Sequence, residues 1–519
     1  MLFTMKNNIL KASLFIIAMA FSRMSYAEIV PGNTVMSPVS KEDFISSANT
    51  DRTMNLSISD CILMSLKNNS EIRIESFNPK IKEENINSAW AEFEPTFNVD
   101  YLMHDKTEKA NNSLLGADVS TNREYILDAG VSGKLVTGTE YSLEFLNTRA
   151  SSNSIYETIN PSYIAEPKMT ITQPVLRGFG IEINKADITI AKNNKQQSRQ
   201  ALTDTAIDVI SRTKSAYYGY IYFREAYDIN KRSLERAVKL FKINGERYKK
   251  GLLSSVVLLE TEAAVLVRRK ALISSERDLK KAEDLLKFVT NLVDDPKFWN
   301  ASIKLTDYLD FKDQNIDLIG SLSAAFKNRP DYESKKIDLE SRDIKIKVAK
   351  NALYPSVDLV GSFGLNGLGS DYSESLNSIE GDYKDWSVGV SLSLPWGGGE
   401  RAEYNKTILE KAQGLMELKR LEQSIILEVR DRVREVDLAV EQVNASKLAK
   451  EAETKNFEAQ KERYVAGQVS THDLLDYEDK LSQSELDYIK SMVDYNVALV
   501  QLDKSQGLTL INNRIQLEG

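Results

Sequence analysis

Two long stretches of the chain repeat apolar residues at spacings of three and four positions. The clearer one runs from about 401 to 464. This spacing is typical of an amphipathic helix, and at 1.5 Å per residue about 64 residues reach roughly 96 Å. The stretch from about 184 to 248 has the same character, and shorter helical patterns follow over about 254–291 and 470–506. We therefore predict two long helical hairpins. A solvated coiled-coil spacer is the alternative interpretation of the helices alone.

A different period appears between residues 386 and 394, where apolar and small polar residues alternate. Trp386, Val388 and Val390 belong to one face, and Ser387 and Gly389 to the other. Nine such residues are enough for a tilted strand that crosses a bilayer, with one face toward lipid and one toward water. Trp386 and Trp396 bracket the segment, as aromatic residues do at membrane interfaces. A half-buried sheet of a soluble domain would show the same period.

Further strands are expected near 96–103, 168–172 and 357–365. An additional hairpin is expected over 125–135 and 139–146, with its turn at Gly138. Transmembrane barrels begin at about eight strands, so four or six strands cannot close by themselves. We therefore hypothesise that several chains share one barrel.

The chain contains an internal duplication. Glu246-Arg247-Tyr248-x-x-Gly251-x-x-Ser254 recurs as Glu462-Arg463-Tyr464-x-x-Gly467-x-x-Ser470. In each copy the glycine is suited to end one helix and the serine to cap the next. We predict a first repeat over 52–300, a second over 301–507 and a tail over 508–519. The first repeat carries 39 more residues between its strand landmarks (79 from Pro95 to Pro174, 40 from Pro355 to Pro395), which a loop and the additional hairpin would occupy.

The first residues have the features of an export signal. Lys6 and Lys11 precede a short apolar run, and small residues ending at Ala27 suit a signal peptidase. We predict a signal peptide over 1–27 and a polar leader over 28–51. No cysteine follows the expected cleavage site, so lipidation is not expected. Cys61, the single cysteine, is interpreted as a buried apolar residue.

Composition argues against several classes of function. The net charge is −8 and no basic stripe is present, which disfavours nucleic-acid binding. The two histidines, His104 and His472, lie far apart, and with one cysteine they give no zinc-ligand spacing. No phosphate-binding loop or nucleophile motif occurs either. We therefore expect neither a cofactor nor an enzyme activity.

These features together resemble the TolC family of outer membrane efflux proteins. The resemblance covers about residues 56–507. It rests on the duplicated turns, on Thr172–Gly178, on Asn328–Asp331 and on Tyr354–Ser356. It implies a mainly α fold with a membrane β-barrel: a homotrimer whose 12-stranded barrel takes four strands from each chain, above a long periplasmic α-helical coiled-coil tunnel. It also implies a periplasmic membrane-fusion adaptor and an inner-membrane pump, either ABC or proton-driven, with drugs, metals or proteins as cargo.

The resemblance also assigns roles to the hairpin ends. Arg247, Tyr248, Gly251, Ser254, Arg463, Tyr464, Gly467 and Ser470 would form the periplasmic entrance and meet the adaptor. Asp473 and Asp476, with Glu260 in the first repeat, would form an acidic ring at the entrance. The alternative for Asp473 is a capping role with Ser470.

Two positions depart from the family pattern. Val469 stands where relatives often have an arginine that closes the entrance, and Val257 replaces an acidic partner. These departures leave the residues that close the entrance open. The competing function is a periplasmic adaptor or another coiled-coil interaction protein, which would show one helical hairpin rather than two.

Overall fold

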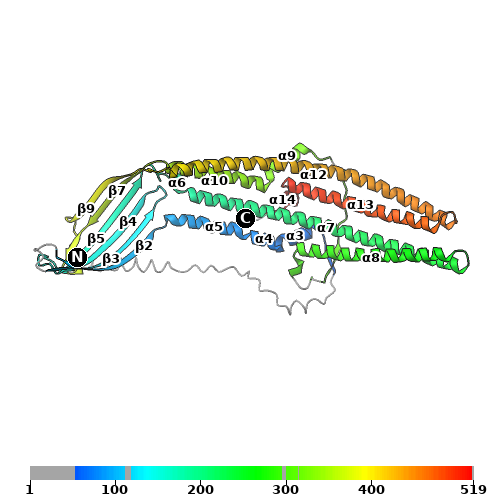
Figure 1. Ribbon diagram of the computed structural model, residues 1–519, viewed down its shortest axis with the longest axis horizontal. Helices are drawn as coiled ribbons and strands as arrows, with labels where there is room; N and C mark the ends of the chain where they lie inside the picture. The colour runs from blue at the N-terminus through cyan, green and yellow to red at the C-terminus, as the bar shows by residue number, and fades with distance from the viewer. Residues whose placement is uncertain (1–52, 111–117, 295–297, 299, 314, 517–519) are drawn as a thin grey trace. The chain divides into compact units, whose positions relative to one another are not determined.

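The computed structural model describes residues 53–110, 118–294, 298, 300–313 and 315–516 (Figure 1). The expected signal peptide and the expected polar leader therefore both lie outside the described residues. By internal contacts the chain divides into two compact units, one of residues 1–54 with 293–302 and one of residues 55–292 with 303–519. The second unit by itself holds the large sheet and the long helices.

The large sheet contains six strands in its main path and a seventh short one beside it. Their order is β2-β3-β4-β5-β7-β9, and every neighbouring pair is antiparallel. The strands are β2 (Thr96–Lys109), β3 (Val119–Lys134), β4 (Glu140–Ser152), β5 (Ser162–Pro174), β7 (Ser356–Leu365), β8 (Gly367–Gly369) and β9 (Lys384–Ser393). The short β8 pairs with β5. Two more strands, β1 (Thr53–Leu56) and β6 (Ser302–Leu305), stand outside this sheet.

The additional hairpin expected from the long first repeat is confirmed as β3 and β4. The two strands pair with each other, and Gly138 in their connection has a φ of 92°, a left-handed conformation that favours glycine. β3 also pairs along the full length of β2, and β4 pairs with β5. The hairpin is thus part of the sheet, whose main path has six strands in this chain where the resemblance implies four.

The two faces of the sheet differ in chemistry across all six strands. Residues directly opposite each other in neighbouring strands lie on the same face. One row across the sheet is apolar and consists of Phe97, Val131, Leu143, Met169, Phe363 and Trp386. The next row lies on the other face and consists of Thr96, Ser132, Ser142, Thr170, Ser362 and Ser387. The alternation predicted for one strand therefore holds for the whole sheet.

The helices form two long hairpins with shorter helices beside them. The first hairpin is α7 (Ala186–Lys249) with α8 (Ser255–Val289), and the second is α12 (Gly399–Val465) with α13 (Thr471–Ser505). The other helices of the described residues are α3 (Ile58–Asn68), α4 (Ser70–Glu75), α5 (Phe77–Trp90), α6 (Ile181–Asn184), α9 (Leu318–Asn328), α10 (Pro330–Ala352), α11 (Tyr372–Asn377) and α14 (Thr509–Asn512). Single 3₁₀ turns occupy Ala91–Phe93 and Leu292–Asp294.

Each long helix is flanked by two shorter ones along its length. α5 and α8 both contact α7, whereas α10 and α13 both contact α12 and also α7 (Figure 1). Two short helices placed end to end thus run beside each long one. Within the described residues, no helix combines the length and hydropathy needed to cross a bilayer.

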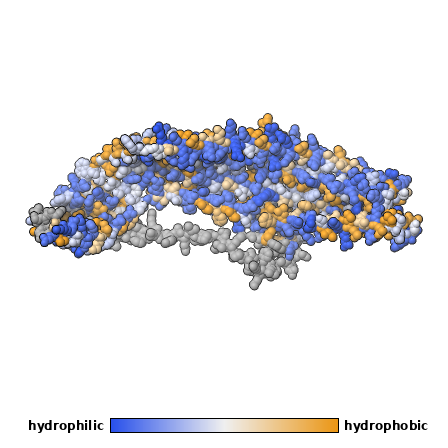
Figure 2. Space-filling model, viewed as in Figure 1, coloured by the Kyte–Doolittle hydropathy of each residue, from blue (hydrophilic) through white to orange (hydrophobic). Residues whose placement is uncertain are grey.

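The core of the second hairpin follows the predicted apolar stripe. Ile425, Val429, Val436 and Val443 of α12 are buried against Tyr495 and its neighbours on α13. The first hairpin differs, because α8 leaves much of its apolar surface exposed. Figure 2 shows hydrophobic residues among hydrophilic ones in the region where α8 runs. Four exposed apolar residues of this helix, here called the α8 strip, are Val256, Leu259, Leu266 and Ile273. Their spacing places them on one side of the helix, available for packing against another protein surface.

Candidate functional site at the hairpin ends and the polar sheet face

The two hairpin turns fold in the same way because the repeated motif supplies the same residues. Gly251 has a φ of 70° and Gly467 a φ of 76°. The amide of Gly251 donates to the carbonyl of Tyr248 at 2.9 Å, and that of Gly467 to the carbonyl of Tyr464 at 3.1 Å. Left-handed glycines of this kind end helices by satisfying their last carbonyls. The sequence therefore locates both turns correctly.

The two tyrosines of the motif have different surroundings. Tyr464 is 6% exposed, and its hydroxyl donates to Asn244 Oδ1 at 2.5 Å. The guanidinium of Arg247 lies 5.2 Å from the centre of the Tyr464 ring. Tyr248, the repeat mate, is 44% exposed. Tyr464 thus ties the second hairpin to α7, whereas Tyr248 remains on the surface.

The remaining cation of the motif, Arg463, is exposed on the last turn of α12. Its guanidinium donates to Gln460 Oε1 at 3.3 Å, within the same helix. Arg463 thus bonds within its own helix, whereas Arg247 of α7 reaches across to the second hairpin.

Asp473 takes the capping position that the sequence offers as its alternative role. The hydroxyl of Ser470 donates to Asp473 Oδ2 at 2.7 Å, and the amide of Asp473 donates back to Ser470 Oγ at 3.1 Å. The Ser470 hydroxyl lowers the pKa of the Asp473 carboxyl below its ordinary value. In the first repeat, Ser254 makes no such side-chain cap.

The other two carboxylates of the expected acidic ring have separate partners. Asp476 lies 2.7 Å from Lys480 Nζ, one turn further along α13. Glu260 of α8 lies 2.9 Å from His472 Nδ1, which connects α8 to the start of α13. Asp473 and Asp476 are both exposed. Within one chain the three carboxylates are not in contact with one another, so a ring would require neighbouring copies.

The two valines that depart from the family pattern both lie at hairpin ends. Val469 packs against a cluster of Phe457, Tyr464, Leu474 and Leu481. Val257 is half-buried in the first turn of α8. An arginine at position 469 would place a charge against this cluster. The second hairpin end is thus held by apolar packing around Val469 and by the contacts of Tyr464.

A buried ion-pair network beside this cluster joins the two hairpins. Glu478 of α13, with a side chain 5% exposed, accepts from Arg268 of α8 at 2.7 Å and from Arg236 of α7 at 3.1 Å. Ser233 also donates to Glu478 at 2.8 Å. Arg268 also pairs with Asp479 at 2.6 Å. These residues lie outside the motifs identified in the sequence. The available signal was Glu478 itself, a charged residue at a stripe position between Leu474 and Leu481.

The two bracketing tryptophans are both strongly exposed. Trp386 lies in β9, in the apolar row of the sheet, and Trp396 lies between β9 and α12. Their exposure suits contact with an apolar surrounding. Their role at a membrane interface stays a prediction.

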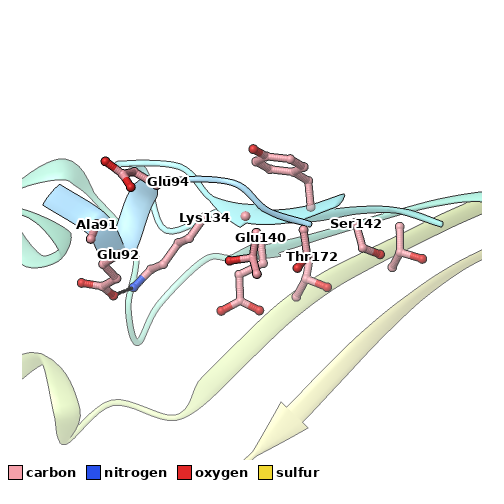
Figure 3. Close-up of a pocket in the computed structure, with 12 residues that line it drawn as sticks. Ala91, Glu92, Glu94, Lys134, Glu140, Ser142 and Thr172 are labelled. Atoms are coloured by element: carbon pink, nitrogen blue, oxygen red, sulfur yellow. Dashed lines mark hydrogen bonds and ion pairs between the residues drawn. The ribbon is translucent and has the colours of Figure 1, made fainter. Parts of the chain in front are cut away.

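A pocket of about 510 Å³ opens where the 3₁₀ turn after α5 meets the polar face of the sheet. Its lining includes Glu92, Glu94, Lys134, Glu140, Ser142 and Thr172 (Figure 3). Lys134 Nζ and Glu92 Oε1 form an ion pair at 2.6 Å. Polar groups thus line the helix-side end of this face, as a water-filled passage requires.

Comparison with known proteins shows which family has this architecture. A family model described as outer membrane efflux protein matches residues 168–292 and 321–508, which is more than half of the chain. The chain belongs to the outer membrane efflux protein family. The predicted family is therefore confirmed, and the matched segments include both helical hairpins.

Individual relatives of this efflux family member are distant. Toxin and drug export protein A of Aggregatibacter actinomycetemcomitans is 25% identical over 211 residues, which are 41% of this chain and 44% of the relative. Outer membrane protein OprJ of Pseudomonas aeruginosa is 25% identical over 190 residues, which are 36% and 39%. The chain thus matches less than half the length of these curated relatives.

The likeness in structure extends further than the likeness in sequence. The CmeC outer membrane channel of Campylobacter jejuni superposes with a TM-score of 0.63 at 17% identity, covering 87% of this chain and 86% of that one. At this identity the likeness shows the fold. The predicted fold class, long helices joined to a sheet in the manner of outer membrane channels, is confirmed.

Proposed function

We propose that this efflux family member is the outer-membrane duct subunit of a tripartite efflux or type I secretion system. The observation that carries the proposal is the six-stranded sheet with one apolar and one polar face, joined to two helical hairpins. Such a sheet can meet lipid on one side and water on the other. The proposed role is conduction and assigns no catalytic chemistry to the chain.

The proposed assembly is a homotrimer. The α8 strip exposes leucine, valine and isoleucine side chains along one helix side, and packing against a neighbouring copy would remove them from water. We place the sheet in the outer membrane, with Trp386 and Trp396 at the lipid interface and the helices in the periplasm.

The hairpin ends would form the periplasmic entrance and the docking surface for a membrane-fusion adaptor, which links the duct to an inner-membrane pump. Exposed Arg463 and Tyr248 and the two glycine turns are the groups available for that contact. Asp473, Asp476 and Glu260, repeated in three copies, would give the entrance a negative potential that favours cations.

Single-channel conductance of the purified protein in planar bilayers tests this proposal. We expect discrete cation-selective steps, and replacing both aspartates (Asp473→Ala with Asp476→Ala) should lower the cation-to-anion permeability ratio by about twofold or more. Lys480→Ala is the matched control, because it removes the cation beside Asp476 and should raise the ratio. Absence of any channel activity would refute the duct. Unchanged selectivity in the double variant would refute the acidic ring alone.

A further inference from the structure

The large sheet has two free edges, formed by β2 and β9. Every residue of both strands is exposed, whereas most residues of the four strands between them are half-buried. The exposed residues include large apolar ones, with Tyr101 67% and Val388 79% exposed. A long, exposed, apolar edge strand is a template for pairing with another chain. Within the described residues nothing covers either edge.

We propose that β2 of one copy pairs with β9 of the next, so that three copies close an 18-stranded sheet instead of the 12-stranded one that the family resemblance implies. The copy number rests on the proposed homotrimer. The number of strands per copy rests on the observed pairing of β3 and β4 inside the sheet.

Strand direction permits this closure. The six strands alternate in direction, so the first and the last, β2 and β9, run in opposite directions. When two copies related by rotation about a common axis meet edge to edge, β2 and β9 are therefore antiparallel. The junction between copies continues the antiparallel order of each copy without a break.

The residues along the two edges are also complementary. Both strands have one end next to the helices, at Thr96 in β2 and at Ser393 in β9, and aligning these ends fixes the register. The following pairs then lie opposite each other: Phe97 with Leu392, Val99 with Val390, Tyr101 with Val388, Met103 with Trp386, and Asp105 with Lys384. The first four pairs are apolar and the last is of opposite charge. All of the apolar members lie on the apolar face that the sheet already has.

This register also determines the angle by which the strands tilt from the axis of the closed sheet. The apolar row that starts at Phe97 ends at Trp386, but in the proposed junction Phe97 lies opposite Leu392, six residues further along β9. Across one copy the register therefore shifts by six residues, which equals the number of strands in that copy. When the shear equals the strand number, as in eight-stranded barrels of shear eight, the strands tilt by about 36°. That value lies within the usual range for membrane sheets.

The additional hairpin then determines the width of the exit. With strands about 4.8 Å apart and tilted about 36°, 18 strands give a backbone diameter of roughly 34 Å, against roughly 23 Å for 12 strands. The polar face with its row of serine and threonine residues would line this passage. Cargo of larger cross-section, such as a polypeptide with residual structure, would fit the exit, and size selection would fall to the helical end.

Electron cryomicroscopy of the purified full-length protein in nanodiscs tests the proposal. We expect three copies and 18 strands, with β2 beside β9 of the neighbour. A closed sheet of 12 strands would overturn it, whether it arises from two copies or from three copies whose β3–β4 hairpin lies outside the sheet. Conductance remains a separate measurement, so a conducting 12-stranded channel would refute this inference and leave the proposed duct intact.

Engineered cysteines test the edge contact. In the double variant Val99→Cys with Val390→Cys, mild oxidation should give covalent dimers and trimers on denaturing gels. Each single variant is a control and should stay monomeric. Cys61 should not interfere, because it is buried and burial raises the pKa of its thiol to about 12. A second control, Val99→Cys with Ile171→Cys, links β2 to β5. These strands are separated by β3 and β4, so a disulfide in this pair, or none in the first, would overturn the proposed order.

Discussion

At the scale of single residues, identical positions of the two repeats serve as controls for each other. Tyr464→Phe removes the donor to buried Asn244 and should destabilise the protein by about 1–3 kcal/mol. Tyr248→Phe, at the matching exposed position, should leave stability within about 0.5 kcal/mol of wild type. Thermal unfolding in detergent, followed by circular dichroism, measures both. Equal shifts in the two variants would contradict the difference in burial.

The serine caps offer a second matched pair. Ser470→Ala removes the hydroxyl that lowers the pKa of Asp473, so this pKa should rise toward its ordinary value. A lowered carboxyl pKa stabilises the folded state above the ordinary value and stops doing so as pH falls through the lowered value. The stability difference between wild type and Ser470→Ala should therefore be larger at pH 7 than at pH 2.

Unfolding midpoints at the two pH values check this dependence. Ser254→Ala is the control, since Ser254 makes no side-chain cap and its replacement should show no comparable pH dependence. A pH-independent effect of Ser470→Ala would mean that the cap acts without the Asp473 charge.

At the scale of helices, the network around Glu478 is a buried polar connection between the two hairpins. Arg268→Ala would leave the Glu478 carboxylate buried with fewer partners and should cost about 3–5 kcal/mol. Arg269→Ala, at the exposed neighbouring position, is the control and should be near neutral. Chemical unfolding of both variants tests this. A small effect at Arg268 would show that Arg236 alone satisfies the carboxylate.

The helices and most strands could be predicted from sequence because their periods extend over many residues. The hairpin of β3 and β4 was visible as extra length in the first repeat and as Gly138 at its turn. The burial of Tyr464 could not be predicted, since the same motif surrounds Tyr248. What separates them is that α13 packs against α7 around Asn244. Such long-range contacts leave no local signal in the motif.

The candidate site was predicted in part. The turn glycines and the Ser470 cap follow from local chemistry, and the structure has both. The ion pairs of Asp476 and Glu260 depend on which helices meet, and Arg268 and Arg236 resemble ordinary surface residues in sequence. Their pairing with Glu478 becomes apparent only when the fold brings α7, α8 and α13 together.

At the scale of the whole molecule, the helical hairpins and the sheet are stabilised in different ways. The hairpins are constrained by side chains that interlock over tens of residues, as at Val429 and Tyr495. The sheet is constrained by backbone pairing and by the alternation of its faces. The sheet can therefore change while the helical hairpins stay the same. This chain fits that pattern, because its hairpins match the family model and its sheet carries additional strands.

The insertion of a whole hairpin, rather than a single strand, has an evolutionary consequence. Two antiparallel strands added inside a sheet leave the directions of the outermost strands unchanged, so copies can still join edge to edge. One strand alone would reverse an edge and bring neighbours together in parallel. The diameter of the closed sheet in proteins of this architecture can therefore change in steps of two strands per subunit. Such gains or losses require no change in the partner proteins that bind the ends of the helical hairpins.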